Sequence, residues 1–479
     1  MLNPPYDFDL LCIGSGPAGQ RAAIQAAKLG KRVALVERRR IVGGVCVETG
    51  TIPSKTLREA VLSFNAVIRH FEQHEGSRYH ARATAGQLLA RVEDVVRREV
   101  EVVVDQMRRN DVTLFHGEAV FTDPHTVTVL TEEGARSFTA ANILIAVGTV
   151  PALAEGVRFD GEFILSSDDV YQLKRLPRYM AVVGGGVIGL EYASMFAALN
   201  INVTLIDKRT RLLEFLDSEI AEELMHQMRN RHVTFRLGEL VERVELTDGT
   251  PQRVVLTLES GKRVVSESVL YAAGRIGATD RLNLAAAGLT AGKRGYLKVD
   301  AQFRTDVPHI FAAGDIIGYP SLASTSALQG RHVGCHAFGV AVEPVVEEHF
   351  PVGIYAIPEI SMVGSTEHQL TEKRVPYETG VARYREIARG QILGDDSGLV
   401  KLLFHRQTRR LLGVHAIGTG ATELIHIGQA VLDLGGGLEY FLRSVFNYPT
   451  LAECYKVAAL DAHNKLNMGL LYAQKETVS

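Results

Sequence analysis

Residues 8–37 read FDLLCIGSGPAGQRAAIQAAKLGKRVALVE, and this stretch decides the fold of the chain. An apolar run leads into a turn with Gly14, Gly16 and Gly19, then into an alanine-rich helical segment and a second apolar run. Glycines in such a turn let the backbone approach a pyrophosphate, whose charge is stabilised by the helix N-terminus. The second run ends at Glu37, 23 positions after Gly14 (37 minus 14), near the spacing of about 20 at which a carboxylate reaches a ribose hydroxyl. The stretch predicts a βαβ unit that binds a dinucleotide.

The same pattern returns at residues 179–207, which read YMAVVGGGVIGLEYASMFAALNINVTLID. The glycines here are Gly184, Gly186 and Gly189, and Asp207 ends the second apolar run, again 23 positions after the first glycine (207 minus 184). Two such units predict two Rossmann-like domains, an α/β fold and two bound dinucleotides.

The residues around Asp207 bear on which nicotinamide nucleotide the second unit binds. A carboxylate at this position accepts hydrogen bonds from the ribose diol of NAD. Lys208, Arg209 and Arg211 follow, and their positive charges could attract the 2′-phosphate of NADP. We therefore expect this site to accept both NAD and NADP. The alternative is that these cations only form a solvated loop.

The chain downstream of the second unit carries two further signals. Residues 305–315 form a predicted strand that ends in Gly-Asp, where the Asp315 carboxylate could hold a polyhydroxylated chain. Ser321 could cap the helix that follows this strand. Beyond about residue 344, strand-like and helix-like segments alternate to the end of the chain, which indicates a third domain of the α+β class.

The composition is that of a multidomain globular protein. The chain has 479 residues, of which 46% are hydrophobic and 22% charged, too long for one core. Its net charge of -3 gives no reason to expect a nucleic-acid partner. It shows no signal-peptide pattern and no run of about 18 apolar residues, so we expect no membrane partner and a cytoplasmic location. The four cysteines, Cys12, Cys46, Cys335 and Cys454, are too scattered to predict a disulfide framework or a metal site.

Taken together, these residues resemble the flavoprotein disulfide reductases, the FAD-dependent pyridine nucleotide-disulfide oxidoreductases of class I. The likeness covers nearly the whole chain and is strongest at residues 43–55, GGVCVETGTIPSK, which look like the redox-active segment of that family. The resemblance implies an FAD domain from residues 1–150 and 276–343, an NAD(P) domain from residues 151–275 and an α+β dimerisation domain from residues 344–479. It also implies a homodimer or a higher homo-oligomer.

The resemblance also assigns site residues. Lys55 and Glu191 match family positions that pair beside N5 of the flavin, where a nearby cation stabilises electron density on the ring, and they are the implied catalytic residues. The implied FAD-binding residues are Gly14, Gly16, Gly19, Glu37, Arg38, Gly43, Gly44, Cys46, Lys55, Gly148, Asp315 and Ala323. The implied NAD(P)-binding residues are Gly184, Gly186, Gly189, Glu191, Asp207, Lys208, Arg209 and Gly274. No metal site is implied.

Two departures from the family pattern bear on the activity. Members that reduce disulfides carry a second cysteine five positions after the first, where this chain has Thr51. Their C-terminal His-Pro-Thr signature begins here with Tyr448 in place of the histidine. A dithiol cycle needs the cysteine pair to relay electrons and the histidine to move protons. The sequence therefore predicts that this chain does not reduce disulfides.

The remaining pattern is similar to that of a family member that passes hydride from NADPH to NAD through FAD. By that resemblance the cycle is ping-pong, with NADPH and NAD entering the same site in turn. The main alternative is an NAD(P)H-dependent quinone or dye reductase of the same fold. Two further alternatives are a peroxidase that uses Cys46 and a structural flavoprotein subunit of a dehydrogenase complex.

Overall fold

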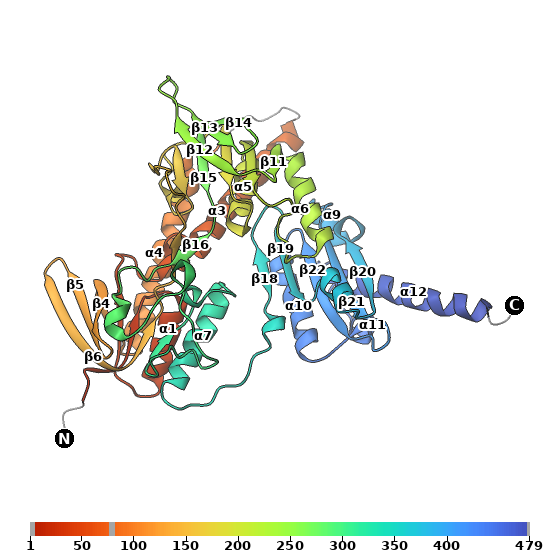
Figure 1. Cartoon of the computed structure of the whole chain (residues 1–479). Coiled ribbons are helices and arrows are strands. Elements are labelled where there is room, and N and C mark those ends of the chain that lie inside the picture. The colour runs from red at the N-terminus through yellow and green to blue at the C-terminus, as the bar shows by residue number, and fades with distance from the viewer. Residues whose placement is uncertain (1–4, 76–81, 477–479) are drawn as a thin grey trace. The chain divides into compact units, whose positions relative to one another are not determined.

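The computed structural model describes residues 5–75 and 82–476, whose elements are drawn in Figure 1. The chain forms two compact units, and both are discontinuous in sequence. Unit 1 consists of Met1–Leu176 and Ala272–Pro344, and unit 2 consists of Pro177–Tyr271 and Val345–Ser479. The finer division into three domains stays a prediction.

A seven-stranded sheet forms the centre of unit 1, in the order β3-β2-β1-β6-β5-β4, with β17 also paired to β6. The pairs that involve β1, β2, β3 and β17 are parallel, whereas β4, β5 and the beginning of β6 pair antiparallel. The strands are β1 (Phe8–Ile13), β2 (Val33–Glu37), β3 (Thr113–His116), β4 (Glu118–Asp123), β5 (Thr126–Thr131), β6 (Gly134–Ile145) and β17 (Ile310–Ala312).

Two helices that lie near the first and last residues of unit 1 in sequence pack side by side in the structure, α1 (Pro17–Lys28) and α7 (Ala323–His336) (Figure 1). Their backbones approach so closely that a Cβ atom on Gly330 would lie 2.0 Å from the carbonyl oxygen of Ala18. The other longer elements of the unit are α2 (Gly44–Glu48), α3 (Thr51–Glu75), α4 (Ala85–Arg109), β7 (Thr149–Pro151), β8 (Ile164–Ser166) and β16 (Arg275–Gly277).

Unit 2 contains a second parallel arrangement of strands, in the order β11-β10-β9-β15. The helix α5 (Val187–Ala198) connects β9 to β10, which makes the second predicted βαβ unit. The strands and the other helix of this part are β9 (Tyr179–Val183), β10 (Asn202–Asp207), α6 (Ser218–Asn230), β11 (Val233–Leu237) and β15 (Ser268–Tyr271). A small antiparallel sheet lies between β11 and β15 in sequence, with strands β12 (Val241–Leu246), β13 (Val254–Leu258) and β14 (Arg263–Ser266).

The C-terminal part of unit 2 is a five-stranded antiparallel sheet in the order β18-β19-β22-β21-β20. The helix α10 packs against β19 and β22, and α12 packs against β20 and β21. The elements are β18 (Val352–Ile354), β19 (Ile360–Gly364), α8 (Glu367–Glu372), β20 (Tyr377–Arg383), α9 (Ala388–Leu393), β21 (Leu399–His405), β22 (Leu411–Ile417), α10 (Ala421–Asp433), α11 (Leu438–Arg443) and α12 (Glu453–Glu476).

The predicted α/β fold class is confirmed, with both βαβ units and an α+β arrangement at the C-terminus. One local prediction was wrong. The N-cap of α7 is Leu322 and makes no side-chain cap bond, while the Ser321 hydroxyl instead donates to the carbonyl oxygen of Gly318. No helix among the described residues has the length and apolar character needed to cross a membrane.

Candidate functional site

The first glycine turn forms one wall of a pocket in unit 1. Gly14 has φ +105, and a Cβ atom there would lie 2.4 Å from the carbonyl oxygen of Ala146, so only glycine fits. A Cβ atom on Gly19 would likewise meet the Gly14 carbonyl oxygen at 1.9 Å. Gly16, by contrast, faces open space. The turn is therefore tight where it meets the protein and unobstructed where a ligand would approach.

The pocket holds about 1100 Å³ of empty space, including its open mouth. It brings together most of the residues that the resemblance assigns to FAD, although they come from distant parts of the sequence. The predicted residues among its lining are Gly14, Gly16, Glu37, Arg38, Gly44, Cys46, Gly148, Asp315 and Ala323. Gly19, Gly43 and Lys55 are not among the lining residues.

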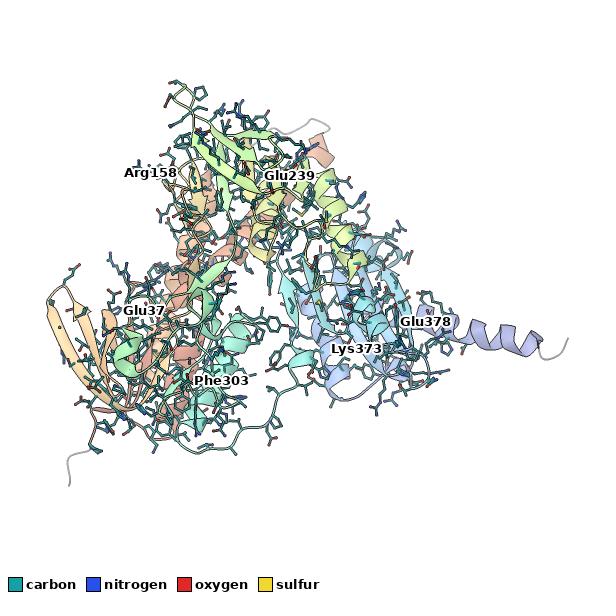
Figure 2. All side chains as sticks on the ribbon, viewed as in Figure 1. Glu37, Arg158, Glu239, Phe303, Lys373 and Glu378 are labelled. Carbon is teal, nitrogen blue, oxygen red and sulfur yellow. The ribbon has the colours of Figure 1, made fainter. Side chains whose placement is uncertain are left out.

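Glu37, labelled in Figure 2, is 4% exposed and is fixed by three hydrogen bonds. Its Oε2 atom accepts from the amide of Ser15 at 3.0 Å and from the Ser15 hydroxyl at 2.6 Å. Its Oε1 atom accepts from the amide of Arg39 at 2.8 Å. The Ser15 hydroxyl also accepts from the amide of Gly43 at 2.8 Å, which ties the turn to the segment before Cys46. Sequence analysis missed this role of Ser15, because a variable position inside the glycine pattern carries no signal.

Part of the segment at residues 43–55, which resembles the redox-active segment of the family, lines the same pocket. Cys46 is on α2, and Thr51, the first residue of α3, also lines the pocket. Burial raises the pKa of the Cys46 thiol, although a hydrogen bond with the Thr51 hydroxyl opposes the shift. The Cys46 thiol is consequently held in its neutral form near pH 7. Burial also raises the pKa of the Asp315 carboxyl group, which follows β17.

The second glycine turn shares two features with the first. Gly184 has φ +106, and a Cβ atom on Gly186 would find open space. Asp207, at the end of β10, is 6% exposed and accepts the amide of Gly185 at 2.6 Å. Arg209 also binds this carboxylate, with distances of 2.7 Å from Nη2 to Oδ2 and 2.9 Å from Nε to Oδ1. Lys208 is exposed.

The two predicted catalytic residues lie in different units, so their pairing stays a prediction. Glu191, on α5, is 4% exposed, and its Oε1 atom accepts from the amide of Tyr355 at 2.8 Å. Lys55, on α3, donates to the Ser54 hydroxyl at 3.2 Å. Gly274 belongs to unit 1, whereas the other residues predicted for NAD(P) belong to unit 2.

The C-terminal segment that departs from the family signature is on the surface of unit 2. Tyr448 is 72% exposed. Five residues later the Oε2 atom of Glu453 is buried without a hydrogen-bond partner. Cys454 is completely buried, and burial raises the pKa of its thiol to about 12. The thiol of Cys454 is therefore an inert part of the core.

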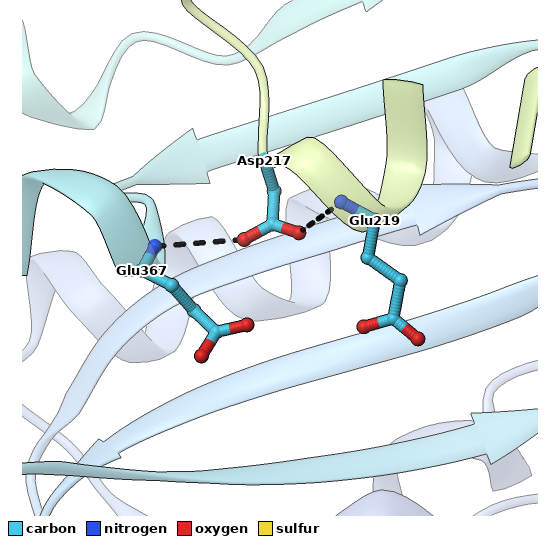
Figure 3. A group of neighbouring side chains, drawn as sticks. All are labelled: Asp217, Glu219 and Glu367. Atoms are coloured by element: carbon cyan, nitrogen blue, oxygen red, sulfur yellow. Dashed lines mark hydrogen bonds between the residues drawn. The ribbon is translucent and has the colours of Figure 1, made fainter. Parts of the chain in front are cut away.

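A group of three carboxylates in unit 2 has the arrangement of a cation site: Asp217, Glu219 and Glu367 (Figure 3). The ammonium group of Lys401 is hydrogen-bonded to all three, at 2.9 Å from Asp217 and 3.0 Å from Glu219. Lys401 thus supplies the positive charge that these carboxylates need. The group is an ion-pair network in which Lys401 and Asp217 are buried and Glu219 and Glu367 are partly exposed.

Comparison with known proteins gives consistent results. Residues 8–330 match the family model for pyridine nucleotide-disulphide oxidoreductases, and residues 350–459 match the model for the dimerisation domain of these enzymes. The chain is 52% identical over 465 residues to a protein of Mycobacterium tuberculosis named soluble pyridine nucleotide transhydrogenase, with 96% of this chain and 98% of the relative covered. A protein of Photobacterium profundum with the same name is 44% identical over 471 residues, with the same coverage.

Solved structures of the same architecture are also similar. The structure of LpdA from Mycobacterium tuberculosis has a TM-score of 0.86 and 27% identity and covers 94% of this chain and 99% of its own. The HOCl-induced flavoprotein disulfide reductase RclA from Escherichia coli has a TM-score of 0.85 and 25% identity, with 94% and 99% covered.

Proposed function

This chain belongs to the pyridine nucleotide-disulphide oxidoreductase family, and we propose that it transfers hydride between NADPH and NAD with FAD as the intermediate carrier. Relatives at 44% and 52% identity over nearly the full length carry the name soluble pyridine nucleotide transhydrogenase. The observation that carries the proposal is Thr51. It lies at the pocket beside Cys46, where a disulfide reductase needs its second cysteine.

The pocket of unit 1 fits the adenine dinucleotide part of FAD. Gly14 and Gly16 leave one wall of the pocket free of side chains. Because α1 begins at this turn, its N-terminal amides can bind the pyrophosphate. The Oε1 atom of Glu37 can accept a hydrogen bond from a ribose hydroxyl in addition to the amide of Arg39. Asp315 lines the same pocket and can hold the ribityl hydroxyls. When bound, FAD supplies the hydride chemistry of the reaction.

The nicotinamide nucleotides use the second turn in our proposal, and NADPH and NAD occupy this site one after the other. Gly186 leaves room for the pyrophosphate, and α5 begins directly behind it. Glu191 is held in place through the amide of Tyr355, and its charge would orient Lys55 at the nicotinamide end. Hydride transfer needs positioning and exclusion of water rather than a proton donor, which suits a chain with Tyr448 in place of the general-base histidine.

The protein works in this proposal as a homodimer or larger homo-oligomer, assembled through the domain that matches residues 350–459. We also propose that it is a soluble protein, in agreement with the name of its relatives, and that it is located in the cytoplasm.

The proposal is tested by anaerobic stopped-flow spectroscopy on the FAD-loaded protein. NADPH should bleach the flavin band, and subsequent mixing with NAD should restore it while NADH forms in equal amount. The result that would overturn the proposal is a flavin that NAD cannot reoxidise. Rapid reoxidation by a quinone in that case would establish the quinone reductase instead, and rapid reoxidation by peroxide that Cys46→Ser abolishes would establish a Cys46 peroxidase.

A further inference from the structure

The two dinucleotide units of this chain are matched copies, so a difference between them is informative. Glu37 and Asp207 occupy the same position in the two copies. Each carboxylate accepts one amide from the glycine turn, that of Ser15 or of Gly185. Each also accepts the amide of an arginine two residues later, at 2.8 Å in both cases.

The guanidinium groups of these two arginines have different hydrogen-bond partners. In the first copy, the guanidinium of Arg39 is hydrogen-bonded to Glu48. In the second copy, the guanidinium of Arg209 turns back and binds Asp207 through both Nε and Nη2. As a result each oxygen of Asp207 accepts two hydrogen bonds, whereas the Oε1 atom of Glu37 accepts only one.

This difference matters for ligands with different adenosine riboses. FAD and NAD carry a free ribose diol that donates to a carboxylate, whereas NADP carries a 2′-phosphate that a bare carboxylate repels. Planar guanidinium groups bind both carboxylates and phosphates with paired hydrogen bonds. The Asp207 side chain is 5% exposed and cannot leave, whereas the Arg209 side chain is 43% exposed and can turn towards a ligand.

We propose that Arg209 lets one site accept both nicotinamide nucleotides by exchanging partners. With NADP, its guanidinium transfers to the 2′-phosphate. With NAD, it withdraws from Asp207 and leaves that carboxylate to accept the ribose diol. The inference deepens the proposed function and rests on it, because only an enzyme that uses both nucleotides needs such an exchange.

The test measures binding of two fragments to the oxidised holoenzyme by calorimetry, so that no turnover is needed. The probes are 2′,5′-ADP and 5′-AMP, which differ only in the 2′-phosphate. Arg209→Gln should weaken 2′,5′-ADP binding by about 10- to 100-fold, the loss expected for a charge-assisted pair, and should leave 5′-AMP binding equal or tighter. Asp207→Asn should have the opposite effect and raise the affinity for 2′,5′-ADP relative to that for 5′-AMP. Arg211→Gln removes the same charge from the same loop and should change this ratio far less.

The proposal is overturned if Arg209→Gln weakens both probes equally or neither, if Arg211→Gln changes the ratio as much, or if the wild-type holoenzyme does not bind 2′,5′-ADP. Flavin content and melting temperature establish that each variant is folded. Arg209→Lys keeps the charge but not the paired hydrogen bonds, so its affinity for 2′,5′-ADP should lie between those of wild type and Arg209→Gln. A wild-type enzyme that binds both probes but fails to pass hydride to NAD would refute the proposed function and leave the binding ratios readable.

Discussion

Glu191 shows how a single buried side chain can serve structure and chemistry at once. Its Oε1 atom satisfies the amide of Tyr355, which a leucine could not do, and its charge is the part that hydride transfer would use. Glu191→Gln keeps the acceptor and removes the charge. We expect Glu191→Gln to retain the melting temperature but to slow flavin reduction by saturating NADPH about 10-fold or more, the scale of a lost electrostatic contact at a reacting centre.

Glu191→Leu is the matched variant, because it loses both properties. It should also lower the stability by about 1–3 kcal/mol, since it leaves a buried amide without an acceptor. Stopped-flow reduction and thermal unfolding of the three proteins separate the two roles. If Glu191→Gln reduces the flavin as fast as wild type, Glu191 is only a structural acceptor and its assignment as a catalytic residue is wrong.

The sequence located the glycine turn because close backbone approach needs glycine at fixed spacings, while the binding roles of its residues stay a prediction. Gly14 and Gly16 belong to a pattern dictated by backbone approach to a phosphate, and the structure places them at the predicted turn. The side-chain hydrogen bond from Arg209 to Asp207 was not predicted. Spacing alone could not predict it, since Arg39 follows its acid at the same spacing but donates its side-chain hydrogen bond to Glu48. Local pattern places an arginine near an acid but does not determine the direction of its side chain.

The packing of α1 on α7 is the feature at the scale of elements that sequence analysis could not supply. Both helices were predicted from local signals, but their contact joins segments about 300 residues apart, which no periodicity encodes. The contact requires Gly330, where a Cβ atom would lie 2.0 Å from the Ala18 oxygen. Because α1 begins at the glycine turn, this contact also fixes the position of the turn.

We therefore expect Gly330→Ala to push α7 away from α1, with a loss of about 1–3 kcal/mol as for other overpacked sites. The melting temperature and the retention of FAD through gel filtration should both fall. Gly86→Ala is the control, because Gly86 lies in α4 with open space around its Cβ position. It should leave the stability unchanged or raise it by less than about 0.5 kcal/mol, since Gly86 lies in the first turn of the helix and not in its interior. Equal melting temperatures for Gly330→Ala and wild type would contradict the close packing.

At the scale of the whole molecule, Lys401 joins parts of unit 2 that are far apart in sequence. It lies on β21, is 1% exposed, and binds Asp217 before α6 together with Glu367 on α8. In the sequence, a lysine within the apolar run LVKLLF indicates only a strand position. Its buried partner Asp217 comes from a segment that was assigned to another predicted domain, which explains why the sequence did not reveal that the two segments form one compact unit.

The network gives a pH-dependent stability whose sign follows from the pKa shifts. Burial alone would raise the pKa of Asp217, but His415 and Lys401 together lower it. The contribution of Asp217 is therefore complete above its unfolded value of about 3.9 and is lost as the pH falls through the lower folded value. Burial alone would lower the pKa of Lys401, but its carboxylate partners raise it. Its contribution is complete below about pH 10.4 and is lost at higher pH.

Lys401→Met should consequently destabilise the protein by about 3–5 kcal/mol at pH 7, because it leaves the buried Asp217 carboxylate without its countercharge. Glu219→Gln removes a partner whose side chain is 45% exposed, so it should cost less than about 1 kcal/mol. Urea unfolding followed by far-UV circular dichroism at a series of pH values checks both.

The deficit of Lys401→Met, its loss in free energy of unfolding relative to wild type, should shrink below about pH 4, since protonated carboxylates no longer need the ammonium group. Burial and the charge of Lys401 lower the pKa of His415 against the opposing effect of Asp217, so protonation of His415 destabilises the fold below about pH 6.5. This loss should be smaller in Lys401→Met, which lacks the ammonium group that disfavours the imidazolium, and the deficit of that variant should therefore begin to shrink below about pH 6.5. A deficit that stays constant from pH 7 to pH 3 would mean that Lys401 acts through packing of its aliphatic chain and not through the ion pairs.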